Sequence, residues 1–211
     1  MAKLLNGING PFSGKVGAVV GYLWKGKAVM RGLPRKRSGG PSPAQIQQHA
    51  KFALMHKFLQ PLLSFLNVTY SSVAVQMTGF SKAFSYNVKN AITGSHPELR
   101  IDYSKVLVSQ GDLQNVLSPE ATASTEGILT FSWVNNSGVG LTNATDQAFV
   151  ALYCEELNKW VYALNPVARK VGSCTIDATK MKGREVQTYI GFISNDGKDA
   201  TDSLYTGMIK L

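Results

Sequence analysis

The sequence predicts an α+β protein in which an N-terminal β-hairpin arm and helices are followed by an antiparallel β-sandwich. The first 41 residues are rich in glycine, residues 42–100 show helical spacing of apolar side chains, and residues 101–211 show the alternation of short strands. With 211 residues, 44% of them hydrophobic, the chain can form one well-buried core with an appendage, or two small domains. We therefore expect a division into 1–41, 42–100 and 101–211.

The first segment predicts a hairpin arm. Two β-type runs, Val16–Trp24 and Lys27–Arg31, lie on either side of Lys25 and Gly26. A turn at this position needs a residue with positive φ, which Gly26 supplies. An isolated two-stranded hairpin is marginally stable in water, so we expect this one to dock on another surface.

The second segment predicts helices. Ser42-Pro43-Ala44-Gln45 has the form of a helix start, and the helix should run to about Gln60 with apolar residues on more than one side. Pro61 either kinks this helix or restarts it as Leu62–Leu66. A further helix is expected from about Phe80 to Ile92.

The third segment predicts seven strands with no helix between them, which is typical of an antiparallel sandwich. Because a domain of this size usually folds independently, we expect a fragment starting at Ser104 to be stable alone. The expected strands are Ser104–Ser109, Gly127–Val134, Gln147–Cys154, Trp160–Ala163, Ala168–Asp177, Glu185–Ser194 and Ser203–Leu211.

Two segments resemble known patterns. Ile128–Trp133, and Gln187–Ser194 followed by Asn195–Lys198, are similar to the second strand and the closing hairpin of fibronectin type III and immunoglobulin-like modules. The motif N-G-x-x-G-x-F-x-G-K-x-G-x-V-V-G-Y-x-W-K-G-K at Asn6–Lys27, with a P-x-x-A-Q helix start, resembles an uncharacterised family of about 210 residues from Bacteroidota. The resemblance implies an Ig/fibronectin-III-like sandwich and brings no activity with it.

The charge is divided unevenly along the chain. The first 97 residues contain twelve lysines and arginines and no acidic residue, whereas residues 98–211 contain ten basic and thirteen acidic ones. This asymmetry favours a polyanionic or acidic partner, since soluble surfaces normally mix both signs. In the alternative interpretation, Tyr22 and Trp24 point inward and the lysines only maintain solubility. The candidate polyanion-binding residues are Lys25, Lys27, Arg31, Arg35, Lys36 and Arg37.

The residues give no support to an enzyme, a cofactor site or a metal site. Gly10–Val16 has three residues between its glycines and no hydroxyl after the lysine, so it is not a phosphate-binding loop. The three histidines lack a set of accompanying ligands, and no G-x-S-x-G motif occurs. With no secretory signal evident, Cys154 and Cys174 are expected to be reduced core residues rather than a disulfide.

We expect a non-enzymatic structural subunit of a larger assembly, such as a phage- or prophage-type particle, made in the cytoplasm and without a membrane partner. The alternatives are a nucleic-acid-binding protein and, with less support, an adhesin or carbohydrate-binding module that uses Trp133 and Trp160. The candidate assembly contacts, with a second copy or another protein, are Phe12, Tyr22, Trp24, Phe52 and Phe58.

Overall fold

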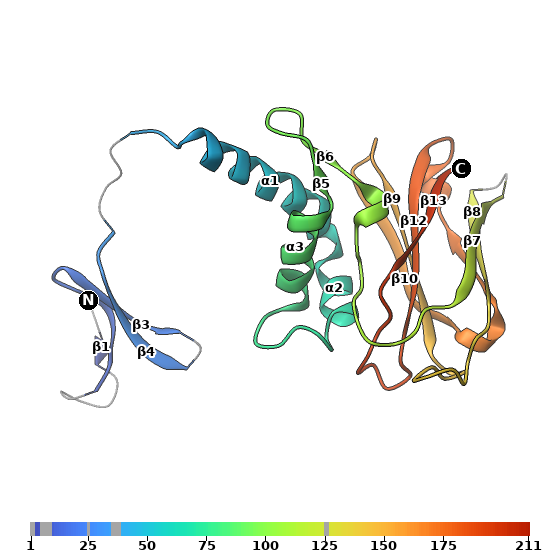
Figure 1. Ribbon diagram of the computed structural model, residues 1–211, viewed down its shortest axis with the longest axis horizontal. Helices are drawn as coiled ribbons and strands as arrows, with labels where there is room; N and C mark the ends of the chain where they lie inside the picture. Colours follow the sequence, from blue (N-terminus) through green and yellow to red (C-terminus); the bar gives the residue numbers. More distant parts are fainter. Residues whose placement is uncertain (1–2, 5–9, 25, 35–38, 125–126) are drawn as a thin grey trace. The chain divides into compact units, whose positions relative to one another are not determined.

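The computed structural model of the chain describes residues 3–4, 10–24, 26–34, 39–124 and 127–211. Its internal contacts divide it into two compact units, Met1–Ser42 and Pro43–Leu211. Figure 1 shows the strands of the first unit and the helices and sandwich of the second. Each unit is described by itself.

The N-terminal unit is an antiparallel sheet in the order β1-β2-β3-β4, formed by β1 (Lys3–Leu4), β2 (Phe12–Val16), β3 (Val19–Trp24) and β4 (Lys27–Gly32). The predicted hairpin is β3–β4, and Gly26 has the expected positive φ of 78°. The predicted run Val16–Trp24 is interrupted by a second turn at Gly17, whose φ is 56°. The arm is therefore a meander of strands rather than a single hairpin.

Helices open the second unit. They are α1 (Pro43–Leu59), α2 (Leu63–Thr69) and α3 (Gly79–Asn90), with a 3-10 turn at Gln60–Leu62. The proline at position 61 lies in that turn, so the helix restarts after it, as one of the two predicted alternatives states. The Thr78 side chain caps α3 by accepting a hydrogen bond from the Ser81 amide at 3.2 Å.

The rest of the second unit is a sandwich of two antiparallel sheets, β10-β9-β12-β13 and β11-β8-β7. Sheets of four and three strands with these neighbours form an Ig/fibronectin-III-like sandwich, so the protein is α+β with this C-terminal fold. Its strands are β7 (Leu117–Ala123), β8 (Ile128–Val134), β9 (Gln147–Cys154), β10 (Lys159–Ala168), β11 (Ser173–Asp177), β12 (Glu185–Ile193) and β13 (Leu204–Lys210).

One predicted strand is wrong. Ser104–Ser109 is not a strand: it begins in a 3-10 turn, and its backbone then bonds to side chains. The Val108 amide donates to Ser203 Oγ at 2.9 Å, and the Val108 carbonyl accepts from Thr69 Oγ1 at 2.7 Å. The sandwich strand that the sequence did not reveal is β7, which contains Pro119 and pairs with β8. A short hairpin, β5 (Ile92–Thr93) with β6 (Arg100–Ile101), precedes this region.

The helices and the four-stranded sheet share one hydrophobic core. Phe58 of α1 packs edge-on against Tyr153 of β9, with ring centroids 4.7 Å apart, and Phe65 of α2 packs against Phe149 of β9 at 5.4 Å. Figure 1 shows the helices on one side of the sandwich. The expected boundary between 42–100 and 101–211 therefore crosses a common core, and the second compact unit begins at Pro43.

No helix in the described part of the chain is both long and apolar enough to span a membrane.

Candidate functional site: the two faces of the N-terminal sheet

Strand pairing gives the N-terminal sheet two chemically different faces. Directly paired residues point to the same side, and alternate residues along a strand point to opposite sides. Gly21 pairs with both Gly14 and Met30, while Leu23 pairs with Ala28. One side, the apolar face, therefore consists of Phe12, Val16, Val19, Leu23, Ala28 and Met30, with glycines between them. Of the described residues on this face, none is charged.

The apolar face is open to solvent. Val16 is 50% exposed, Leu23 57% and Met30 62%. Phe12 is half-buried because its ring lies over Gly21, where an added Cβ would come within 2.8 Å of a ring carbon and would clash with the Phe12 carbonyl oxygen. Among the described residues of this unit, Gly21 alone is buried, so the sheet has no core of its own.

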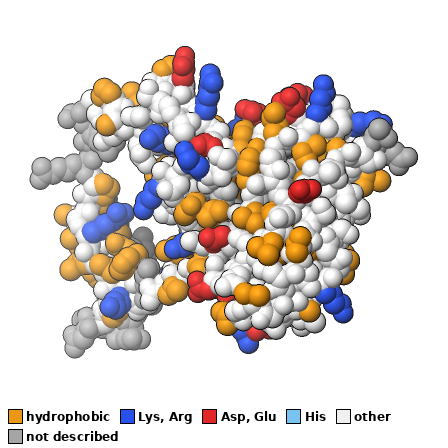
Figure 2. Space-filling model, turned by 45° about the vertical axis from the view of Figure 1, so that its right-hand side comes forward, with side chains coloured by type: hydrophobic (Ala, Val, Ile, Leu, Met, Phe, Trp, Pro, Cys, Tyr) orange, Lys and Arg blue, Asp and Glu red, His pale blue; other side chains and the backbone are white. Residues whose placement is uncertain are grey.

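The opposite side, the cation–aromatic face, carries Lys15, Tyr22, Trp24, Lys27 and Arg31, together with the half-buried Val20 and Val29. Trp24 pairs with Lys27, and the guanidinium carbon of Arg31 lies 5.6 Å from the centroid of the Tyr22 ring. That separation is typical of a cation–π contact. On the side of the molecule visible in Figure 2, hydrophobic and basic side chains gather on the arm.

These positions settle the orientation of the arm's aromatic residues. Tyr22 and Trp24 lie on the same face as Lys27 and Arg31 and are exposed, so the interpretation in which they point inward finds no support in the described residues of this unit. The other four candidate polyanion-binding residues, Lys25, Arg35, Lys36 and Arg37, lie outside the described residues. Sequence reasoning missed the apolar face, although the alternation of glycine and apolar residues along β2 and β3 carries its signal.

Two candidate assembly residues lie in α1, and the structure separates them. Phe58 is 1% exposed and belongs to the shared core, and its carbonyl accepts a hydrogen bond from Trp160 Nε1 at 2.8 Å. It cannot contact a partner, so that expectation is wrong: the helix turns this side toward the sheet. Phe52 remains 44% exposed, although its ring meets Phe84 of α3 edge-on at 5.5 Å.

The tryptophans of the sandwich do not form an open platform for a sugar. Trp133 is 6% exposed, and its Nε1 donates to the Arg169 carbonyl oxygen at 2.9 Å. Trp160 is half-buried between Phe58 and Tyr189, with ring centroids 5.0 Å and 5.8 Å away. The carbohydrate interpretation therefore loses the exposed aromatic faces on which it depends.

A hollow of about 500 Å³ lies where the end of α1 meets β6 and the turn after β9. Lys57, Arg100 and Glu155 contribute charge to its lining, over a floor that includes Phe58 and Tyr153. Burial, followed by the nearby Glu155 carboxylate, raises the pKa of Tyr153 to about 12. At neutral pH the tyrosine is therefore a neutral hydrogen-bond donor. The volume is in the range of small-molecule sites, but the lining contains no nucleophile activated by a base.

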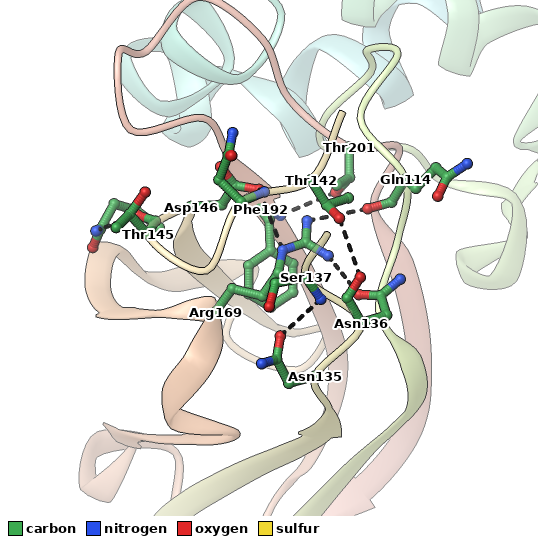
Figure 3. Close-up of polar contacts among 12 residues, drawn as sticks. Gln114, Asn135, Asn136, Ser137, Thr142, Thr145, Asp146, Arg169, Phe192 and Thr201 are labelled. Carbon is green, nitrogen blue, oxygen red and sulfur yellow. Dashed lines mark hydrogen bonds and ion pairs between the residues drawn. The ribbon is translucent and has the colours of Figure 1, made fainter. Parts of the chain in front are cut away.

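The buried side chain of Arg169 makes several polar contacts inside the sandwich (Figure 3). Its NH1 donates to Asn136 Oδ1 at 2.9 Å, its NH2 donates to the Gln114 carbonyl at 3.1 Å, and its guanidinium carbon lies 4.4 Å from the Phe192 ring centroid. Burial lowers the pKa of Arg169, and the charge of Asp146 opposes this shift. These contacts hold the loop between β8 and β9 in place, which is a structural role.

The comparisons with solved structures returned matches at low similarity. The fn3 domain of human collagen alpha-1(XX) is 9% identical, with a TM-score of 0.35, and the match covers 46% of this chain and 83% of that chain. A structure described as a myokine is 12% identical, with a TM-score of 0.32, and the match covers 47% and 97% of the two chains. No curated protein matches.

A family model covers nearly the whole chain, from the apolar face of the arm to the last strand of the sandwich. Residues 11–207 match it, so the chain belongs to the family of unknown function DUF6266.

Proposed function

We propose that this protein is a non-enzymatic structural subunit of a larger assembly and that its N-terminal sheet makes the contacts between subunits. A phage- or prophage-type particle of the Bacteroidota, the origin suggested by the N-terminal motif, is the assembly that we favour. The helices and the sandwich form the body of such a subunit.

The exposed apolar face of the N-terminal sheet carries this proposal. Val16, Leu23 and Met30 are each at least half exposed, and Gly21 alone is buried among the described residues of this unit. A sheet with an apolar side is stable when another layer covers that side, and contiguous exposed apolar surface marks sites of protein interaction. The arm therefore has the chemistry of a segment that docks.

A second function, polyanion binding, is favoured by the cation–aromatic face. Lysines and arginines pair with phosphates, while tyrosine and tryptophan rings can stack on bases. The two functions are compatible because they use opposite faces of one sheet. Genome packed inside a particle would meet the cation–aromatic face while subunits meet through the apolar face.

Light scattering coupled to size-exclusion chromatography tests the assembly function. The nuclease-treated full-length chain should show a mass above that of one subunit, and the mass should fall on dilution. A strict monomer at every accessible concentration, with an arm that proteases remove readily, would overturn the proposal.

Salt-dependent binding to duplex DNA tests the second function. If the six candidate cations each neutralise one phosphate, the slope of log K against log salt should be about −5, from roughly −0.9 per contact. Arg31→Gln should make the slope less negative by about 1. Lys182→Gln, an exposed lysine of the body, is the matched control. Absence of binding at low salt would exclude this function.

A further inference from the structure

We infer that the apolar face of the N-terminal sheet packs against the same face of a second copy, so that two arms form a two-layered β-sandwich. This inference rests on the proposed assembly function and names its partner. It assigns the contact between subunits to Phe12, Val16, Leu23 and Met30, and it leaves the cation–aromatic faces on the two outer sides.

The division of charge between the faces favours a two-layered arrangement. A sheet with one uncharged apolar side and one charged side corresponds to half of a β-sandwich, in which the apolar sides interdigitate about 10 Å apart. Among the described residues of this sheet, the lysines and Arg31 lie on the face of Trp24, which also carries Val20 and Val29, whereas Leu23 and Met30 lie on the uncharged face. A second apolar sheet surface would complete such a sandwich.

The absence of charge on the described apolar face restricts what can cover it. Residues 1–42 contain eight lysines and arginines and no acidic residue, yet no described residue of the apolar face is charged. The occupant of this face must therefore also be uncharged, and a second copy of the face meets that condition. The described cations, Lys3, Lys15, Lys27 and Arg31, then lie on opposite outer sides of two layers, more than about 8 Å apart, so salt screens their repulsion at physiological ionic strength.

The shape of the face is compatible with a second copy. Gly32, where an added Cβ would meet nothing within 4 Å, lies on this face beside the exposed Met30, whereas Phe12 fills the space over Gly21. An open position beside a protruding side chain allows two copies related by a two-fold axis to interdigitate.

Two neighbouring residues of β3 provide a matched test. Leu23 and Trp24 are both 57% exposed but lie on opposite faces. In the full-length, nuclease-treated chain, Leu23→Asn and Met30→Asn should each weaken self-association by about tenfold or more, as expected for central apolar contacts. Trp24→Asn should leave it unchanged. Analytical ultracentrifugation over a concentration series gives the dissociation constants.

A mixing experiment distinguishes a second arm from any other occupant. Labelled Leu23→Asn chains are titrated with unlabelled wild-type protein. If two apolar faces meet, the mixed pair has one altered face. Its dissociation constant should therefore be higher than that of the wild-type pair. Unchanged affinity would show that wild-type arms dock on another surface of the labelled chain, and would overturn the inference while leaving the assembly function intact.

The remaining outcomes are also distinguishable. Self-association of Leu23→Asn and Met30→Asn at wild-type strength would overturn the inference alone. Monomeric wild-type protein would overturn the assembly function together with it. Equal weakening by Trp24→Asn would show that the contact does not distinguish the faces, which contradicts the two-layer arrangement.

Discussion

The guanidinium of Arg169 and the carboxylate of Asp146 face each other inside the sandwich, with 3.4 Å between Nε and Oδ2 and both side chains fully excluded from solvent. Oδ2 also accepts a hydrogen bond from the Asn143 amide at 2.8 Å. The pair therefore ties the start of β9 and the preceding loop to the end of β10. Breaking it from either side leaves a buried charge without its partner.

Replacing Arg169 alone should destabilise the body strongly. We expect Arg169→Met to lower the free energy of unfolding by about 3–5 kcal/mol, because the Asp146 carboxylate stays buried without its counter-charge. Urea denaturation followed by circular dichroism measures the change. The double variant Arg169→Met with Asp146→Leu should lose less than the sum of the two single variants. Simple additivity would contradict the pairing.

The shared core predicts which fragments fold. Residues 43–211 should unfold cooperatively, whereas residues 104–211 should not, because removal of the helices uncovers Phe149, Tyr153 and Tyr189. This outcome reverses the expectation from size alone. Within the full chain, Phe65→Ala should lower the free energy of unfolding by about 3–5 kcal/mol. A cooperative, monomeric 104–211 fragment would show that the helices are dispensable.

One methyl group added at Gly21 should weaken self-association through the arm and leave the stability of residues 43–211 unchanged. Gly21→Ala places a Cβ against Phe12, whereas Gly40→Ala, outside the sheet, adds a Cβ with nothing within 4 Å. Gly21→Ala should therefore weaken self-association, and Gly40→Ala should not. Thermal unfolding of the body should be the same for both variants. Equal association of the two would contradict the described packing of β2 on β3.

The thiols should be unreactive in the folded protein. Cys154 and Cys174 are free and buried, and burial raises the pKa of Cys174 to about 11. Because the thiolate is the reactive form, Ellman's reagent should modify neither residue at neutral pH until denaturant is added. Rapid modification of the native chain would place at least one thiol at the surface.

Asp196 should titrate at low pH. Its carboxylate accepts hydrogen bonds from Ser194 Oγ at 2.6 Å and from the Lys198 amide at 3.2 Å, which lower its pKa to about 2. The folded-state pKa is thus below the unfolded value of about 4. The stabilisation of the β12–β13 turn is complete above about pH 4 and is lost as the pH falls toward 2. Carboxyl chemical shifts followed by NMR would give the value directly, and a midpoint near 4 would contradict it.

Sequence patterns predicted most of the sandwich. Ile128–Val134 alternates clearly, and the continuous apolar run Gln147–Cys154 was predicted with the bounds that the structure has. β7 was not predicted because Pro119 and few apolar residues hide its alternation. Ser104–Ser109 was misassigned because it begins in a 3-10 turn and the backbone amides of Leu107 and Val108 bond to side chains instead of a neighbouring strand. For the arm, sequence composition identified the basic and aromatic residues but not their faces. Those depend on the turn at Gly17, which sets the register of β2 against β3.

The shared core also determines which segments of this chain can be joined to another protein as folded units. Phe58 and Phe65 cover side chains of β9 in a shared core, so the helices form a third layer of the sandwich. A chimera that joins this arm to a foreign module should keep residues 43–211 together, and a design that cuts near residue 101 divides a single folding unit. The two parts of this chain that can be exchanged as units are therefore residues 1–42 and residues 43–211.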